Sequence, residues 1–249
     1  ENFDCGGHGI VSGGNVNLGG GTSRQRAAGI EDNADAVFEE WIRPDDLERR
    51  YTDRDLTRVF ADMSAETFEW MVANGVQFEG TITGGDQRNG PTVQWPVYEE
   101  LITSYPTRKG SGLARALEKS ARAKGAQILL LHKMTGLVQN PSTKVVEGLI
   151  ATTEGRTLRI RGTGGVILAT GGHTSNVHFR RMFDPRLTEV LTVAGEPYSY
   201  QDASGERAAL EIGASLWGLV NQTLENGDNI RCQRVLGTKW NYMTWEFES

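Results

Sequence analysis

The chain contains 249 residues, a length that suits one large domain or one domain together with part of a second. Hydrophobic residues make up 38% of it and charged residues 23%, values that exclude a wholly disordered chain, a coiled coil and a collagen-like repeat. The formal net charge is −6 and no long run of lysine or arginine is present, so DNA and RNA are not expected as partners.

Neither a membrane span nor a metal site is predicted. The longest apolar runs, such as residues 128–131 and 166–169, are far shorter than the roughly 20 residues of a membrane helix. Cys5 and Cys232 form no C-x-x-C pair, so they indicate neither a zinc site nor a disulfide framework, and the four histidines lack metal-binding spacing. The sequence defines neither the compartment nor the oligomeric state, and the cytoplasm is our expectation.

Glycine is the unusual residue, with 31 in the chain, well above the roughly 7% of an average protein. Nine of these glycines fall within residues 1–29. Apolar residues placed among them, Ile10, Val11, Val16 and Leu18, predict an ordered loop anchored on a core rather than a flexible linker. Spacing alone leaves two explanations for the glycines: main-chain amides that bind a phosphate group, or a tight crossing of loops that requires glycine for packing.

Three helices are predicted between residues 32 and 75, each with a polar cap and an apolar stripe. The first is capped by Asp32 or Asn33. The second begins at a capping box in residues 52–55, and the third is capped by Ser64 and ended by Gly75. The stripes are expected to face the core because their members recur at helical spacing. They are Val37, Trp41 and Ile42; Leu56, Val59, Phe60 and Met63; and Phe68, Met71 and Val72.

Residues 80–96 are rich in Gly, Thr, Asn and Pro, and they predict a long loop or an irregular hairpin. From Gly110 onward the pattern changes to helix and strand in alternation. A helix opens at Gly110 and closes at Gly125, and the apolar run 126–131 then predicts a short buried strand. This part of the chain therefore predicts an α/β fold.

A β-hairpin is predicted next, with strands at residues 145–151 and 157–161. A third strand is predicted at residues 166–169, ending in a glycine-rich turn, which is where open α/β sheets bind ligands. A last helix begins at Asp202 or Ser204 and runs to residue 213. The chain contains no Walker motif, no G-x-G-x-x-G turn after a strand and no G-x-S-x-G nucleophile elbow.

Four segments of the chain become specific when they are read together and in order. They are Gly6-Gly7-His8 through GGGTSRQRAAGIEDNADAVF (19–38), GSGLARALEKSARAKGAQILLLHKMTGLV (110–138) with the hairpin, VILATGGHTSN (166–176) and ASGERAALEIGA (203–214). In this order they resemble the FAD-binding superfamily that contains the fumarate reductase and succinate dehydrogenase flavoproteins and the 3-oxosteroid dehydrogenases.

The resemblance implies an α/β fold, a Rossmann-like FAD-binding domain that includes a β-hairpin or meander. It places this domain at residues 1–220 and the start of a capping domain at residues 221–249. The domain is expected to be incomplete, because the family's G-x-G-x-x-G unit and its C-terminal part are not found in the chain. We therefore expect these 249 residues alone to retain FAD weakly or not at all, since the helix N-terminus that stabilises the pyrophosphate would be missing.

The resemblance also implies which residues contact FAD, grouped here by the part of the cofactor that they approach. Residues at the adenosine half are Glu1, the backbone of Met134, Ala169, Thr170 and Gly171. Residues at the pyrophosphate are Gly6, Gly7 and His8, and those near the flavin end are Ser12, Gly13, Gly14 and Asn15. Ser204 stands where many relatives carry Asp.

The implied function is an FAD-dependent oxidoreductase that acts on a CH–CH bond by hydride transfer to or from flavin N5. The alternatives are a 3-oxosteroid 1-dehydrogenase and a non-catalytic remnant of a flavin domain. No catalytic residue is assigned. The His-Pro-Thr motif of fumarate reductases does not follow Gly213 and Ala214, which argues against a dicarboxylate. The aromatic residues Trp217, Trp240 and Trp245 favour a small-molecule substrate that is apolar or steroid-like.

Overall fold

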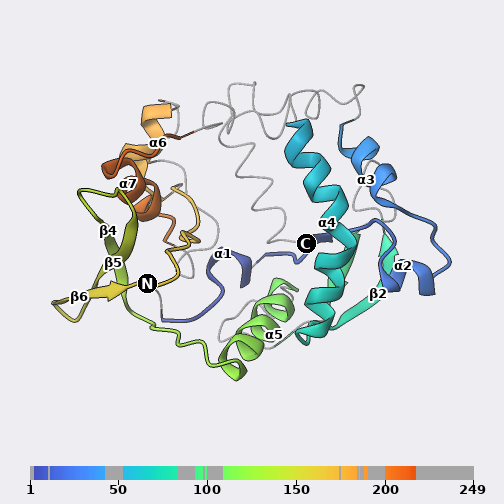
Figure 1. Cartoon of the computed structure of the whole chain (residues 1–249). Helices are drawn as coiled ribbons and strands as arrows, with labels where there is room; N and C mark the ends of the chain where they lie inside the picture. Colours follow the sequence, from blue (N-terminus) through green and yellow to red (C-terminus); the bar gives the residue numbers. More distant parts are fainter. Residues whose placement is uncertain are drawn as a thin grey trace. The chain divides into compact units, whose positions relative to one another are not determined.

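The computed structural model describes residues 3–10, 12–42, 53–83, 93–97, 99, 109–173, 175–183, 185, 188–189 and 200–216. The chain divides into two compact units (Figure 1). Unit 1 consists of residues 1–8 and 128–249, and unit 2 consists of residues 9–127. Residues 221–249, predicted as the start of a second domain, lie outside the described residues, so that boundary stays a prediction.

The described helices and strands alternate irregularly along the chain. In order they are α1 (Gly7–Ile10), β1 (Val16–Asn17), α2 (Ser23–Ala27), α3 (Ala34–Trp41), α4 (Arg54–Ala73), β2 (Phe78–Thr83), β3 (Val93–Pro96), α5 (Gly110–Ala123), β4 (Lys133–Gln139), β5 (Val146–Thr153), β6 (Arg156–Arg161), α6 (Val177–Phe183) and α7 (Ser204–Glu211).

Unit 2 contains an antiparallel sheet in the order β1-β3-β2. The pairing of β2 with β3 shifts register between Glu79 and Thr83, so the irregular hairpin predicted for this region is confirmed. The loop before β1 is ordered as predicted, because Ile10, Val16 and Leu18 are buried and anchor it on the unit. Val16 and Leu18 pack with Phe68 of α4 to form a small core.

The short helices of unit 2 begin at side-chain caps that the sequence encodes. Thr22 and Gln25 form a capping box at the start of α2, with each side chain accepting a main-chain N–H from the other residue. Asn33 caps α3 by accepting the N–H of Ala36 at 2.9 Å. Of the two caps predicted there, Asn33 is therefore correct. Asp32 instead accepts the Gly20 N–H at 2.8 Å.

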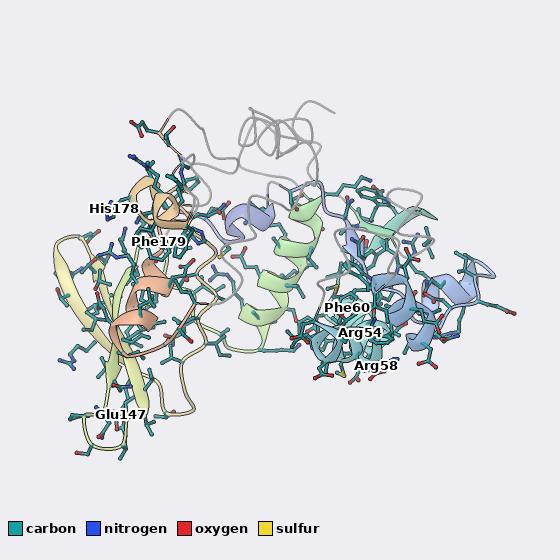
Figure 2. All side chains as sticks on the ribbon, turned by 90° about the horizontal axis from the view of Figure 1, so that it is seen from above. Arg54, Arg58, Phe60, Glu147, His178 and Phe179 are labelled. Carbon is teal, nitrogen blue, oxygen red and sulfur yellow. The ribbon has the colours of Figure 1, made fainter. Side chains whose placement is uncertain are left out.

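Helix α4 differs from its prediction in both length and orientation. It is one continuous helix capped by Asp53, and Ser64, predicted to start a new helix, lies in its middle. Its buried face consists of Thr57, Ala61, Ser64 and Phe68. The predicted core stripe is wrong, since its members Leu56, Val59, Phe60 and Met63 are all exposed. Arg54, Arg58 and Phe60 are seen along this helix in Figure 2.

The reason for this orientation is the glycine loop that lies against α4. Ser64 Oγ accepts the main-chain N–H of Gly19 at 2.9 Å, and both groups are buried. A main chain can approach a helix this closely only where the helix presents small side chains. The small face of α4 therefore packs inward although it is less apolar than the opposite face.

The end of α4 and both ends of α5 agree with the sequence. Asn74 is the C-cap of α4, and Gly75 follows with φ of +93°, the left-handed conformation that glycine adopts without strain. Helix α5 begins at Gly110, and Gly125, which follows its C-cap Lys124, has φ of +88°.

Unit 1 contains an antiparallel meander in the order β4-β5-β6. The predicted hairpin corresponds to β5 and β6, and its two turn residues, Glu154 and Gly155, both have positive φ, as tight hairpin turns require. Strand β4 was not predicted. Helix α7 packs against β4, and the two elements lie side by side in Figure 1.

Two predicted strands are wrong. Residues 126–131 and 166–169 form no strand, and Leu131 and Ile167 are 60% and 92% exposed. A strand needs a neighbour for its main-chain N–H and C=O groups. Within the part of the chain that the structure describes, neither segment pairs with another. Apolar composition alone therefore did not determine strand formation at these positions.

The core of unit 2 can be tested at Phe68, which is fully buried with its ring centroid 4.5 Å from that of Phe78. We expect Phe68→Ala to lower the free energy of unfolding by about 3–5 kcal/mol, because it removes buried contacts and leaves a cavity. The control is Leu56→Ala on the same helix, which should change it by less than about 1 kcal/mol. Urea unfolding followed by circular dichroism measures both, and equal losses would contradict the observed orientation of α4.

Candidate functional site

In unit 2 the glycine loop crosses the start of α5 at main-chain contact distance. The Gly110 N–H donates to the carbonyl of Ser12 at 3.2 Å, and the Ser12 hydroxyl donates to the carbonyl of Gly9 at 2.9 Å. A Cβ on Gly110 would lie 2.1 Å from the Gly9 oxygen, and one on Gly14 would lie 2.6 Å from the Gly110 nitrogen. The packing explanation therefore holds for Gly14 and Gly110.

Other glycines of the same segment are open. A Cβ on Gly7 or Gly9 would meet nothing within 4 Å among the described residues, and one on Gly13 would meet only Asn15 Oδ1, at 3.8 Å. Their main chain is therefore accessible to a ligand from that side. This arrangement suits phosphate or ring oxygens held against backbone amides. The packing explanation thus holds for Gly14 and Gly110, and ligand binding stays a prediction for the open glycines.

In unit 1 the glycine-rich turn after residue 169 lies directly against the start of α7. The Ala203 N–H donates to the carbonyl of Gly172 at 3.3 Å. A Cβ on Gly205 would lie 2.0 Å from Thr170 Oγ1, so only glycine fits at this contact. The turn at residues 169–171 and Ser204, which the sequence predicts as site residues, are therefore brought together.

Asp202 connects this turn to strand β4. Its Oδ1 accepts the Ser204 N–H at 3.0 Å, its Oδ2 forms an ion pair with Lys133, and its main-chain oxygen accepts from Asn176 Nδ2 at 2.9 Å. Partial burial alone would raise the pKa of Asp202, but the hydrogen bonds from Lys133 and Ser204 outweigh it and lower the pKa below its usual 3.8. Met134, predicted to contact adenine, follows Lys133 directly.

A second polar pair, between His173 and Glu206, lies beside the turn. His173 Nδ1 is 3.2 Å from Glu206 Oε1, and both side chains are largely buried. The imidazole also packs against the rings of Phe179 and Phe183, at centroid distances of 5.3 and 6.0 Å. Phe179 points inward from α6 while its neighbour His178 is exposed (Figure 2).

Sequence reasoning missed these two polar pairs. Lys133 and Asp202 are 69 residues apart, and His173 and Glu206 are 33 apart, so no local pattern connects either pair. Of the other predicted site residues, Glu1 lies outside the described residues and nothing is described of the His8 side chain. Gly6 and Gly7 both have positive φ.

Two further observations concern the described residues as a whole. They contain no group of three or more His, Cys, Asp or Glu side chains arranged to hold a metal ion. None of their helices combines the length and the apolar composition of a membrane span.

Comparison with known proteins assigns the cofactor. A model of the FAD binding domain family matches residues 2–217. The chain belongs to this family. FAD is therefore its cofactor, as the four sequence segments predict. The match covers both glycine-rich regions, the loop in unit 2 and the turn in unit 1.

Curated relatives of this FAD binding domain include two bacterial reductases. The urocanate reductase of Eggerthella lenta is 30% identical over 199 residues, which are 74% of this chain and 29% of the relative. The vinyl phenol reductase of Lactiplantibacillus plantarum is 27% identical over 199 residues, covering 78% of this chain and 36% of the relative. The chain thus spans about a third of the length of the relatives it matches.

Solved structures of this fold include a flavocytochrome c3 fumarate reductase, with a TM-score of 0.68 and 24% identity over 84% of this chain and 34% of that one. A 3-ketosteroid-Δ4-(5α)-dehydrogenase from Rhodococcus jostii RHA1 gives a TM-score of 0.67 and 21% identity, over 86% of this chain and 48% of that one. At these identities the likeness shows the fold. The predicted fold class and the predicted superfamily are both confirmed.

The residues of the FAD binding domain fit a dinucleotide in two respects. The main chain at Gly7, Gly9 and Gly13 leaves room that a Cβ would occupy. Beside the turn of unit 1, Glu206 Oε2 is buried and no described residue hydrogen-bonds to it, so a donor from a ligand suits it. Phosphate oxygens against the open backbone and hydroxyl or amine donors beside the carboxylate match the chemistry of FAD.

The crossing in unit 2 predicts a strong effect of Gly110→Ala. The added Cβ would press on the Gly9 carbonyl oxygen and force the loop away from α5, so we expect a loss of about 1–3 kcal/mol in the free energy of unfolding. Gly13→Ala, in the same loop but with open space, should be nearly neutral. Urea unfolding distinguishes the two variants, and similar losses would contradict the packing explanation.

The Asp202 network predicts a pH-dependent contribution to stability. A carboxylate whose pKa is lowered by folding stabilises the fold above its usual pKa, and this contribution disappears as the pH falls through the lowered value. Asp202→Asn should therefore lower the melting temperature at pH 7 by about 1–2 °C, a small shift because Lys133 is half exposed. The difference from wild type should close between about pH 5 and pH 2.

The control for Asp202→Asn is Glu154→Gln, which breaks an ion pair with Arg156 whose two side chains are both largely exposed. Its melting temperature should stay within about 0.5 °C of wild type at every pH. A deficit of Asp202→Asn that persists at low pH would show that the ion pair is not its cause.

Proposed function

We propose that this chain is the FAD-binding part of an oxidoreductase that acts on a carbon–carbon bond, with hydride transfer to or from flavin N5. The observation that carries the proposal is the family match over residues 2–217, together with the open glycine main chain in that region. Two relatives whose names are urocanate reductase and vinyl phenol reductase support the reaction class. Bound FAD supplies the hydride chemistry.

In this proposal the residues of the chain bind and orient the cofactor. The main chain of Gly6, Gly7 and His8 lies by the pyrophosphate, where Gly7 leaves open space, and residues 12–15 approach the flavin end. Of these last four residues, Gly14 acts by keeping the loop close to α5. The turn at residues 169–171 closes over the adenosine half, held from behind by Gly205 and α7. Glu1 accepts hydrogen bonds from the ribose.

The network around Asp202 has a positioning role in this arrangement. Lys133 and Ser204 both bind its carboxylate, so the start of β4 and the start of α7 are fixed to one another. Because Met134 follows Lys133, this ion pair supports the proposal that the backbone of Met134 meets the adenine near the turn. The proposed role of these residues is to hold the cofactor, and no catalytic residue is assigned to them.

The substrate proposed here is a small unsaturated molecule. A 3-oxosteroid is the second candidate, supported by two solved steroid dehydrogenases that share the fold at TM-scores of 0.67 and 0.70. The tryptophans that favour an apolar substrate in the sequence, Trp217, Trp240 and Trp245, lie outside the described residues. A non-catalytic remnant of a flavin domain is the third candidate.

FAD titration tests the proposal directly. We expect the purified 249-residue chain to quench flavin fluorescence in a saturable manner, with a weak affinity in the range of about 10⁻⁶–10⁻⁴ M. The chain with chemically reduced FAD is then mixed, without oxygen, with urocanate or acrylate, and with 1,4-androstadiene-3,17-dione, the unsaturated steroid that can accept a hydride at the 1,2-bond. Reoxidation of the flavin by an unsaturated acid supports the leading candidate, and a response to the steroid alone supports the second. If the folded chain does not bind FAD at all, the third candidate, a non-catalytic remnant of a flavin domain, is supported instead.

A further inference from the structure

Glu206 carries a carboxylate that is only half satisfied within the protein. It lies in the first turn of α7, and its side chain is 18% exposed. Oε1 lies 3.2 Å from His173 Nδ1, whereas Oε2 is buried and has no hydrogen-bond partner among the residues that the structure describes. Buried polar atoms in proteins are hydrogen-bonded in the large majority of cases. An unpaired buried carboxylate oxygen destabilises a fold more than an unpaired neutral oxygen does.

Helix electrostatics do not explain this environment. An acidic side chain in the first turn of a helix is stabilised by the helix dipole, but this benefit does not require burial. Of the nearby basic residues, Lys133 on the strand that packs against α7 pairs with Asp202, Arg180 of α6 binds the main-chain oxygen of Thr188, and Arg207 is exposed. The burial of Oε2 therefore needs another reason.

The orientation of the carboxylate is fixed by its surroundings. His173 holds Oε1, and the rings of Phe179 and Phe183 hold the imidazole. Gly205, the residue before Glu206, contacts Thr170 of the glycine-rich turn, and Gly172 of the same turn accepts the Ala203 N–H. Oε2 is thus presented from a rigid position beside the turn that is proposed to cover the adenosine half of FAD.

We propose that Glu206 Oε2 accepts a hydrogen bond from the adenosine half of FAD, either from a ribose hydroxyl or from the adenine amino group, with His173 as its positioning residue. The inference rests on the proposed function. It explains why the protein keeps an unpaired buried acceptor: the bond forms only when the cofactor is bound. No bond is made or broken in this step, and no proton is transferred.

The conservative variant Glu206→Gln tests this role. It keeps an oxygen for His173 and replaces the charged, unpaired oxygen by a neutral amide group. Without FAD the variant should melt about 1–4 °C above wild type, because an uncompensated charge is removed. Its dissociation constant for FAD, measured by flavin fluorescence, should rise about 10-fold or more, because a hydrogen bond to a charged acceptor is lost.

The matched control is Glu211→Gln, at the exposed end of the same helix. It should change neither the melting temperature nor the FAD affinity. A purely structural role for Glu206 would lower the melting temperature of Glu206→Gln, and this result would overturn the proposal. The proposal would also be overturned if wild type and Glu206→Gln bound FAD with the same affinity. That result would leave the proposed function intact. Failure of the wild type to bind FAD would instead count against the proposed function.

Nucleotide competition identifies the donor. ADP should bind Glu206→Gln more weakly than wild type, whereas FMN, which lacks the adenosine half, should bind both equally. If the ribose 2′-hydroxyl is the donor, 2′-deoxy-ADP should no longer distinguish the two proteins, and if the amino group is the donor, inosine diphosphate should not. A loss of affinity confined to FMN would overturn the placement at the adenosine half.

Discussion

Close approach of chain segments at glycine positions is the constraint on which the loop of unit 2 and the turn of unit 1 each depend. In unit 2 the loop at residues 9–14 approaches α5 so closely that Gly110 has no room for a Cβ, and in unit 1 Gly205 has none beside Thr170. Each contact fixes a segment whose neighbouring glycines remain open. The same residue type therefore serves two purposes: some glycines permit packing, and others leave backbone accessible to a cofactor.

Local features of the fold could be predicted from the sequence because their causes lie within a few residues. Asn33 caps its helix, Gly75 and Gly125 follow helix ends with positive φ, and Glu154 and Gly155 form the hairpin turn. The face that α4 buries could not be predicted, because it is decided by the contact of Ser64 with Gly19, 45 residues earlier in the chain. The predicted strands at residues 126–131 and 166–169 are wrong for a similar reason, because a strand forms only where a second strand, distant in sequence, pairs with it.

The candidate site divides in the same way. Glycine-rich segments and their order identify the family and its cofactor, and the structure brings the turn at 169–171 and Ser204 together. The polar groups that hold them, the pairs Lys133–Asp202 and His173–Glu206, join residues far apart in sequence. Each partner alone is an ordinary charged or polar residue, so only the folded chain reveals which of them interact.

Helix α4 shows what its unusual orientation means for sequence change. Its inward face carries Ala61 and Ser64 beside the main chain of Gly19 and Gly20, so the limit at these two positions is volume, and an added methylene would be felt before a change in polarity. Its outward face, with Leu56 and Val59, is free of that limit and can exchange apolar for polar residues at little cost in stability. Sequence change along this helix should therefore be wider at its exposed apolar positions than at its small buried ones, the reverse of the usual pattern.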